Sequence, residues 1–339
     1  MSCEFKGIDQ LNDLKIALLF IVLTSISANA HDVGFRRLDN VSTNGLSMFV
    51  LYPTTSKPKS VDFGPFTLNV AIGGAMEDGR FPLAVLSHGS GSSGLSYKDI
   101  ALSLVHHGFI VAMPLHPHNN YLDNSLEGKV ENYVNRPKDI SASIDKLFAI
   151  PKLSAHIDPQ KIAVLGHSIG GYTALVVSGA IAKTKALIDL CKSLPTLPDP
   201  YCAPVLSGEL TQNITVNSKD TRIRAQVLMA PVGALFLSKH AFDNVDIPTL
   251  LLVAGKDQEL TAAYNAQVIK NGLEKTGRLT VKVIPNAGHY SFLTAYPDSL
   301  KATLGVIAQD PQGFDRVEFQ KSIGDQIATY LIQVLSPHT

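Results

Sequence analysis

The chain has 339 residues, of which 45% are hydrophobic, so it can bury at least one substantial core. Its charge is balanced, with 29 basic and 29 acidic side chains, and it has no run rich in lysine or arginine. This composition argues against nucleic acid as a partner and predicts one large α/β domain.

The N-terminal segment contains the longest strongly apolar run. "IALLFIVLTSISANA", residues 16–30, ends in the small-residue pattern that precedes cleavage of a secretory signal peptide. The run is too short to span a bilayer comfortably. Acidic residues before it depart from the positively charged start of such signals, so a buried N-terminal helix is the alternative. We expect a signal peptide over residues 1–30 and a secreted or periplasmic protein with no stable membrane span.

After residue 31, short apolar runs alternate with helix-like segments. Continuous apolar runs are typical of strands buried on both faces. The order predicts a doubly wound, mostly parallel sheet with helices on both faces and an antiparallel start, which is an α/β fold. Strands are expected at 35–38, 47–52, 66–70, 82–86, 109–113, 162–165, 226–229, 249–253 and 279–284, and helices at 97–107, 136–150, 170–182, 262–276 and 317–334.

The stretch from about 183 to 224 breaks this alternation. It has no clean strand–helix pair, and it carries several prolines and both cysteines of the expected mature chain. Two cysteines close in sequence in an exported protein predict a disulfide between Cys191 and Cys202, the alternative being two unrelated buried thiols. We expect a cap-like insertion over the carboxyl edge of the sheet, within a single domain covering residues 31–339.

A serine lies among glycines between a predicted strand and a predicted helix. Residues 166–170, "GHSIG", fit the G-x-S-x-G pattern of a nucleophile elbow. In such an elbow the glycines let strand and helix approach closely, and a tight turn exposes the hydroxyl of Ser168. The alternative is a glycine-rich turn whose serine only caps the helix.

A nucleophilic serine needs a base and an acid that orients the base. Asp257 and His289 each follow a predicted strand, so both fall at the sheet edge that carries Ser168. The order serine, acid, histidine is also the order expected with an elbow. The alternatives are a solvated turn aspartate, with Glu259 or Asp246 as competitors, and a packed or surface histidine.

An oxyanion hole requires two backbone donors. The first expected donor is the N–H of Ile169, directly after the nucleophile. The second is the N–H of Ser90, in the loop "HGSG" after the strand at 82–86. A merely flexible glycine loop is the alternative. His88 is expected to anchor this loop rather than to act as the base.

A second polar concentration, "PLHPHNNYLDN", follows the strand at 109–113. His116 and His118 suggest a metal site, in which Asp123 is the one candidate for a third ligand. We do not predict a metal site from so small a set. We expect this loop to line the substrate cleft, a structural loop being the alternative. The predicted substrate-binding residues are His167, His116 and Tyr290.

Taken together, these motifs resemble the α/β-hydrolase superfamily, in particular predicted dienelactone hydrolases and platelet-activating-factor acetylhydrolase-like esterases. The resemblance covers about residues 34–335 and implies a triad of Ser168, Asp257 and His289, with Ser90 and Ile169 as oxyanion donors. One departure is that dienelactone hydrolase proper has a cysteine nucleophile where this chain has serine. The motifs that carry the resemblance are "LAVLSHGSG", "HPHNNY", "NRPKDI", "VLGHSIGGYTAL", the Asp257 loop and "NAGHYSF".

We therefore expect a secreted serine hydrolase that cleaves carboxylic esters through an acyl-enzyme intermediate, without a cofactor. Its expected substrate is a small-molecule or lipid-like ester. A serine peptidase or amidase would use the same residues and is the alternative enzyme. A non-catalytic binding module on the same fold is the alternative from another class. The sequence leaves the oligomeric state open.

Overall fold

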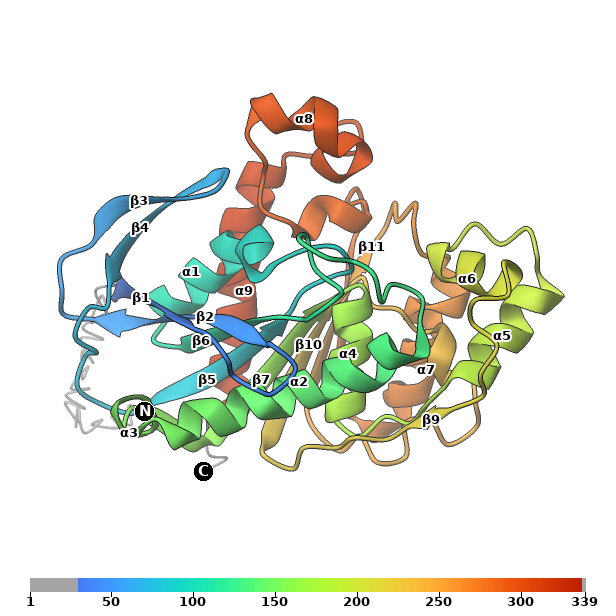
Figure 1. Ribbon diagram of the computed structural model, residues 1–339, viewed down its shortest axis with the longest axis horizontal. Helices are drawn as coiled ribbons and strands as arrows, with labels where there is room; N and C mark the ends of the chain where they lie inside the picture. Colours follow the sequence, from blue (N-terminus) through green and yellow to red (C-terminus); the bar gives the residue numbers. More distant parts are fainter. Residues whose placement is uncertain (1–29, 337–339) are drawn as a thin grey trace, which may run out of the picture.

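The computed structural model describes residues 30–336 (Figure 1). The expected signal peptide lies outside the described residues, apart from Ala30. The main strands are β1 (Asp32–Leu38), β2 (Ser47–Thr54), β3 (Lys59–Phe63), β4 (Phe66–Ile72), β5 (Phe81–Ser87), β6 (Ile110–Leu115), β7 (Ile157–His167), β10 (Ile223–Met229), β11 (Thr249–Ala254) and β12 (Leu279–Ile284). The helices are α1 (Lys98–His106), α2 (Val130–Ala149), α3 (Pro151–Ser154), α4 (Ile169–Val177), α5 (Thr184–Ser193), α6 (Ala203–Leu206), α7 (Ala266–Leu273), α8 (Asp298–Leu304) and α9 (Arg316–Leu335).

These ten strands form one sheet in the order β12-β11-β10-β7-β5-β6-β2-β1-β4-β3. The six strands from β12 to β6 pair in parallel, whereas β2 is antiparallel to both β1 and β6. The expected mostly parallel sheet with an antiparallel start is confirmed. Strand β3 was not predicted, because its sequence "KSVDF" alternates with polar residues at an exposed edge.

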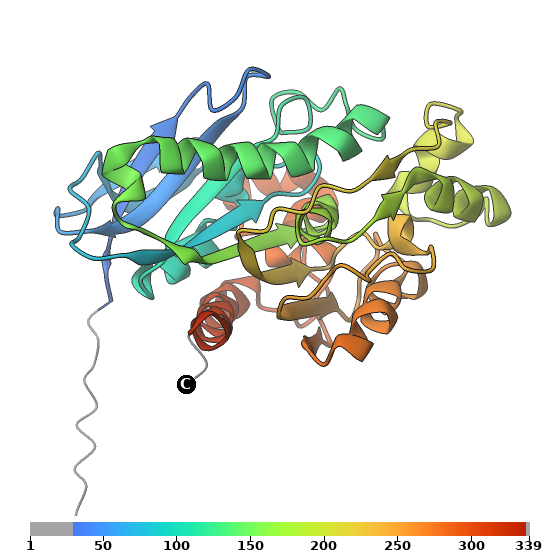
Figure 2. The ribbon, with the colours of Figure 1, turned by 90° about the horizontal axis from the view of Figure 1, so that it is seen from below.

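Helices cover both faces of the sheet. Figure 2 shows α2 on one face and α9 on the other. Successive residues of one strand enter different cores: Val164 packs in the core under α2 and α4, and Leu165 packs in the core under α1 and α9. This double burial explains why the strands read as continuous apolar runs.

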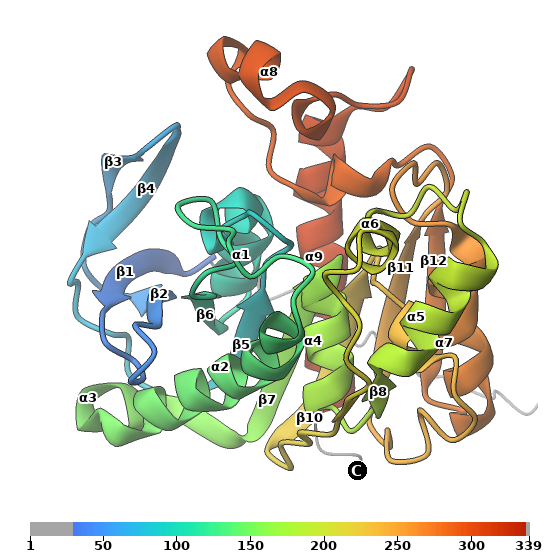
Figure 3. The ribbon, with the colours of Figure 1, turned by 45° about the vertical axis from the view of Figure 1, so that its right-hand side comes forward.

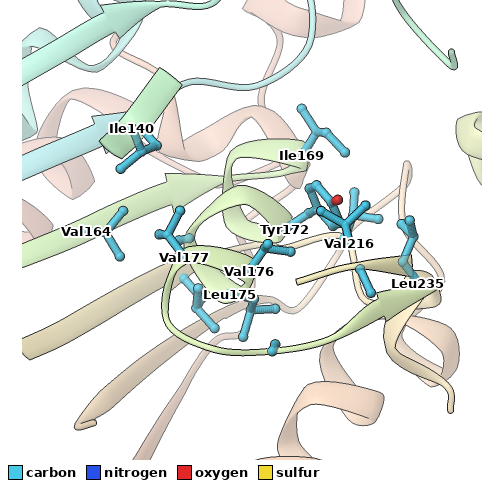
Figure 4. Packing of buried hydrophobic residues seen from close by; sticks show 14 of the residues in the cluster. Ile140, Val164, Ile169, Tyr172, Leu175, Val176, Val177, Val216 and Leu235 are labelled. Carbon is cyan, nitrogen blue, oxygen red and sulfur yellow. The ribbon is translucent and has the colours of Figure 1, made fainter. Parts of the chain in front are cut away.

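Helix α4 lies at the centre of the first core. All of its residues are buried, and Tyr172, Leu175, Val176 and Val177 pack with Ile140 of α2 in Figure 4. The serine that precedes α4 is therefore carried by one of the most firmly packed elements of the fold.

Two helix boundaries differ from the sequence-based expectation. Helix α2 begins at Val130 rather than Arg136 and contains Pro137, and α4 ends at Val177 rather than near Ala182. Gly179 has φ 113°, a conformation that L side chains rarely adopt, so the chain turns away soon after α4 ends.

The expectation that residues 183–224 lack a strand–helix pair is wrong. The short strand β8 (Ala182–Lys183) pairs with β9 (Thr215–Val216) and leads directly into α5. The proline-rich part that follows obscured this unit in the sequence. The predicted disulfide joins Cys191 of α5 to Cys202, and both cysteines are buried. Figure 3 shows α5 and α6 on the side of the molecule that carries β11 and β12, away from the β3–β4 hairpin.

A second segment over the sheet was not predicted. Residues 294–308, including α8, rise above the carboxyl ends of the strands, opposite the β3–β4 hairpin (Figures 1 and 3). The rings of Tyr296 and Phe66 lie 5.4 Å apart and join this segment to the hairpin. None of the helices between residues 30 and 336 is long and apolar enough to cross a membrane.

Candidate active site

Ser168 occupies a tight turn between β7 and α4. Its backbone has φ 57° and ψ −122°, which is strained for a residue other than glycine. A Cβ added to Gly166 would overlap the carbonyl of Gly170, and one added to Gly170 would overlap the carbonyl of Ser87. The two glycines therefore permit the close approach of strand and helix that the sequence pattern indicates.

His289 and Asp257 meet beside this turn. His289 Nδ1 lies 2.9 Å from Asp257 Oδ2, and both side chains are largely buried. The other carboxylate oxygen of Asp257 accepts hydrogen bonds from the N–H groups of Glu259 and Leu260, at 2.9 and 2.8 Å. These bonds fix the carboxylate so that Nδ1 donates to it and Nε2 is left for another partner.

The two acids that could compete with Asp257 occupy other positions. Asp246 pairs with Lys219 on the surface, and Glu259 lines the pocket described below without bonding to the imidazole. Ser168 and His289 line that same pocket. The structure thus brings Ser168, Asp257 and His289 together at the carboxyl edge of the sheet.

His167 supports the turn from behind. Its Nδ1 lies 2.9 Å from the hydroxyl of Tyr97, and its Nε2 lies 2.9 Å from the carbonyl of His289. Burial lowers the pKa of His167 well below the ordinary value, so its ring is neutral near pH 7. Both ring nitrogens are engaged within the protein. The ring lines the pocket, as expected for a substrate-binding residue, and its two nitrogens also support the turn.

The loop that is expected to supply one oxyanion donor, residues 88–91 (the oxyanion loop), lies against the same support. The Gly89 N–H donates to the Tyr97 hydroxyl at 3.1 Å. Ile169 is the first residue of α4, where a backbone N–H has no intrahelical partner. Within residues 30–336, neither the N–H of Ile169 nor that of Ser90 donates a hydrogen bond to another group. Both expected donors remain available to a ligand.

The expectation that His116 lines the substrate cleft is wrong. His116 is fully buried and is absent from the lining of the pocket. Its Nδ1 lies 2.9 Å from Asp139 Oδ2, and its Nε2 lies 2.9 Å from Ser87 Oγ. The backbone N–H of His116 donates to Nε2 of His88, and Nδ1 of His88 donates to the carbonyl of Gly89. The two histidines therefore fix the base of the oxyanion loop.

The other histidine of the loop at residues 114–124, His118, lies apart from this hydrogen-bond network. His118 is exposed and pairs with Asp123 at 2.6 Å. In the part of the chain that the structure describes, no group of three or more His, Cys, Asp or Glu side chains is placed to hold a metal ion.

A pocket of about 1030 Å³ opens above Ser168. Tyr290, the third predicted substrate-binding residue, lines it, and burial raises the pKa of its hydroxyl. One side of the pocket consists of apolar side chains from the β3–β4 hairpin and from residues 294–308. These are Phe63, Phe66, Tyr296, Leu300, Leu304 and Ile307.

Residues of the 183–224 insertion also line the pocket, among them Tyr201 and Pro204. The buried carboxylate of Asp199 ties this insertion to the loop that follows Asp257. It accepts hydrogen bonds from Thr261, through both its N–H and its hydroxyl, and from Asn265 Nδ2 at 2.7 Å. No sequence pattern indicates this connection, since a single aspartate among prolines is typical of a turn.

Two family comparisons match overlapping parts of the chain. Residues 54–194 match the chlorophyllase family, and residues 149–299 match the C-terminal domain of the family that includes BAAT and acyl-CoA thioester hydrolases.

Among curated proteins, the chain is similar to platelet-activating factor acetylhydrolase of Canis lupus familiaris, at 28% identity over 39% of this chain and 40% of that one. It is similar to the Bos taurus protein of the same name at 27% identity, with the same coverage. The chain thus spans about two fifths of the length of these relatives.

Among solved structures, a ferulic acid esterase from Streptomyces cinnamoneus superimposes with a TM-score of 0.59 at 17% identity, covering 93% of this chain and 94% of that one. A dienelactone hydrolase-like promiscuous phosphotriesterase from metagenomic libraries superimposes with a TM-score of 0.54 at 12% identity, covering 89% and 99%. These two structures confirm the α/β-hydrolase fold. The sequence matches to platelet-activating factor acetylhydrolases confirm the expected resemblance to that group of esterases.

Proposed function

We propose that this chain, an α/β-hydrolase by fold, is a serine hydrolase that cleaves carboxylic esters through an acyl-enzyme intermediate on Ser168. The observation that carries the proposal is the strained serine that lines a mainly apolar pocket, with a carboxylate-bound histidine lining the same pocket. The relatives that act on esters by name support the same reaction class.

In the proposed mechanism, Ser168 Oγ attacks the ester carbonyl while His289 Nε2 takes the hydroxyl proton. The charge that develops on the carbonyl oxygen is stabilised by the N–H groups of Ser90 and Ile169. The alcohol leaves with the proton from His289, and Ser168 keeps the acyl group. Water then attacks the acyl-enzyme with the same histidine as base, which releases the acid and restores the serine. Asp257 holds the imidazole in the tautomer that both steps require.

The pocket lining supports neutral or cationic esters with an apolar arm as substrates. The apolar side chains of residues 294–308 and of the β3–β4 hairpin provide a surface for an acyl or alkyl chain. The lining contains Glu127, Glu209 and Glu259 but no lysine or arginine. An anionic ester would therefore meet like charges in the pocket and would be a poorer substrate.

We also propose that the protein is exported. Structural disulfides persist in oxidising compartments, and the Cys191–Cys202 bond supports such a location. The N-terminal apolar run agrees with it, although that run lies outside the described residues. Counting free thiols on the unreduced, denatured mature protein tests the inference, and two titratable thiols would contradict it.

A panel of nitrophenyl esters tests the proposed activity. The neutral acyl groups should run from acetate to dodecanoate. A succinate ester, which has the four carbons of butyrate and a terminal carboxylate, provides the anionic comparison. We expect hydrolysis of the neutral esters, weaker hydrolysis of the succinate ester, and loss of all activity in Ser168→Ala. Ser178→Ala, at the other end of α4, is the matched control and should keep full activity. A wild-type protein that turns over none of these esters would overturn the proposal.

A further inference from the structure

Arg136 is the largest fully buried side chain of the fold. It lies in the first half of α2, behind the oxyanion loop. Taking a guanidinium out of water is expensive unless its donors are satisfied. Burial lowers the pKa of Arg136 to about 9, and the nearby Asp139 carboxylate acts in the opposite direction, so the side chain stays charged near pH 7.

The guanidinium gives its hydrogen bonds to neutral groups. Within the described residues its acceptors are Thr173 Oγ1, Asn119 Oδ1, Ser87 Oγ and the His88 carbonyl, and none of them is a carboxylate. Asp139 bonds instead to His116 and to Asn44. An ion pair is therefore not what fixes Arg136 in place.

One set of these bonds leads to the oxyanion loop. Nη2 donates to the carbonyl of His88, two residues before Ser90. Nη1 donates at 2.5 Å to Asn119 Oδ1, and Asn119 Nδ2 in turn donates to Ser90 Oγ at 2.9 Å. The oxyanion loop is thus held at its base, through the His88 carbonyl, and at Ser90, whose side chain is bound and whose N–H is an expected oxyanion donor.

A separate bond leads to the nucleophile helix. Nε donates to Thr173 Oγ1 at 3.1 Å, and that hydroxyl donates to the Ile169 carbonyl at 3.0 Å. Thr173 lies one turn into α4, and Ile169 supplies the other expected oxyanion donor.

We infer that Arg136 is a positioning residue that sets the separation of the two oxyanion donors, Ser90 N–H and Ile169 N–H, by bonding to both of the segments that carry them. The inference rests on the proposed function, since only an acyl-transfer reaction uses this pair of donors. A planar guanidinium donates in several fixed directions at once, which a lysine ammonium in the same place does not reproduce. Each oxyanion donor is worth about 10²–10³ in kcat, so a small change in their separation is costly.

The test compares Arg136→Lys with Arg222→Lys. Arg222 also bonds to α2, at the Ser141 carbonyl and the Asp145 carboxylate, but it has no contact with the oxyanion loop. For Arg136→Lys we expect kcat to fall by about 10²-fold with KM within about threefold of wild type. Affinity for a trifluoromethyl ketone, which binds as a tetrahedral oxyanion, should fall by the same factor as kcat. Arg222→Lys should leave all three quantities unchanged.

Two further variants keep the test decisive if Arg136→Lys does not fold. Thr173→Val removes the link to α4, and Asn119→Ala removes the link to Ser90. Each should lower kcat and inhibitor affinity by about tenfold. In a folded double variant, kcat should be little lower than in Arg136→Lys alone. Both Arg136→Lys and Thr173→Val break the same connection between residue 136 and α4.

The outcomes separate this inference from the proposed function. An active wild type whose folded variants keep kcat and inhibitor affinity, even with lower thermal stability, would overturn the positioning role alone. A wild type without esterase activity would overturn the proposed function and this inference together.

Discussion

The pocket is bounded by two walls of different construction. The polar wall comprises Gly89, Ser90 and residues 167–169, with the buried side chains of Ser87, His88, Asn119 and Arg136 behind them. The apolar wall comprises Phe63, Phe66, Tyr296, Leu300, Leu304, Ile307 and Pro204. In the polar wall, buried groups are joined by directional hydrogen bonds, whereas the apolar wall is formed by side chains in van der Waals contact. Directional bonds can fix atoms to the precision that chemistry requires, and apolar contact can accept substrates of different lengths. We therefore expect the polar wall to determine the rate of the reaction and the apolar wall to determine which acyl chain lengths are accepted.

The largest expected effect breaks the chemistry at the polar wall. His289→Gln should lower kcat by about 10⁴–10⁶ for every ester, and Asp257→Asn by about 10⁴. Because the triad acts as a unit, combining His289→Gln with Ser168→Ala should cost no more than either change alone. Steady-state kinetics on one short and one long ester provide the measurement. Additive losses in the double variant would contradict the assignment.

The polar wall should also make the fold sensitive to acid. Burial lowers the pKa values of His88, His116 and His167 well below the ordinary value of about 6.5, so these histidines stay neutral in the folded state. As the pH falls below about 6.5, these histidines take up protons in the unfolded chain before they do so in the folded protein. The free energy of unfolding therefore decreases as the pH falls. Burial raises the pKa of Asp139 to about 6, so this carboxyl takes up its proton first in the folded state and offsets part of the loss.

Urea unfolding at several pH values measures this effect. We expect the free energy of unfolding to fall by about 2–3 kcal/mol per pH unit between about pH 6 and pH 5. His116→Asn removes one of the three histidines and should make the dependence less steep. A slope equal to that of wild type would show that burial of His116 does not contribute.

A smaller effect is expected at the apolar wall. Leu304→Ser with Ile307→Ser should lower kcat/KM for dodecanoate esters by about tenfold, through lost apolar contact with the chain. Activity on acetate esters should stay within about twofold, since a short acyl group needs only the polar wall. Val306→Ser is the matched control, because Val306 lies in the same segment but is exposed and does not line the pocket. Equal losses on acetate and dodecanoate would remove the distinction between the two walls.

The smallest effect on activity is expected from the disulfide. Closing a loop of this length stabilises a protein by about 3 kcal/mol in the chain-entropy account. Cys191→Ala with Cys202→Ala should lower the melting temperature and loosen the insertion that carries Pro204. We expect KM for long-chain esters to change a few-fold while kcat on acetate stays the same. A larger loss on acetate than on long esters would show that the insertion supports the triad rather than the apolar wall.

The two walls also differ in how far the sequence predicted them. The strands, the turn at Ser168 and the placement of Asp257 and His289 followed from local patterns, because parallel strands bring the loops at their carboxyl ends to one edge. The disulfide was predicted from two nearby cysteines in an expected exported chain. These features depend on neighbours in sequence or on sheet topology alone.

The rest depends on tertiary contacts. Arg136 stood inside the quoted motif "NRPKDI", but nothing in a single sequence shows that its guanidinium is buried against residues 87–90 and 119. His116 looked like a cleft residue because a histidine in a polar loop gives no indication of burial. The apolar wall at residues 294–308 lacks strong helical periodicity, and it becomes recognisable only where it faces Phe66.

The central claim is that Ser168 is the nucleophile, and covalent labelling tests it most directly. Wild-type protein should react with a fluorophosphonate at a single site, and peptide mapping by mass spectrometry should place the adduct on Ser168. Ser168→Ala should not react under the same conditions, while Ser178→Ala should react as wild type does. An unlabelled wild type, or an adduct on another residue that persists in Ser168→Ala, would contradict the account.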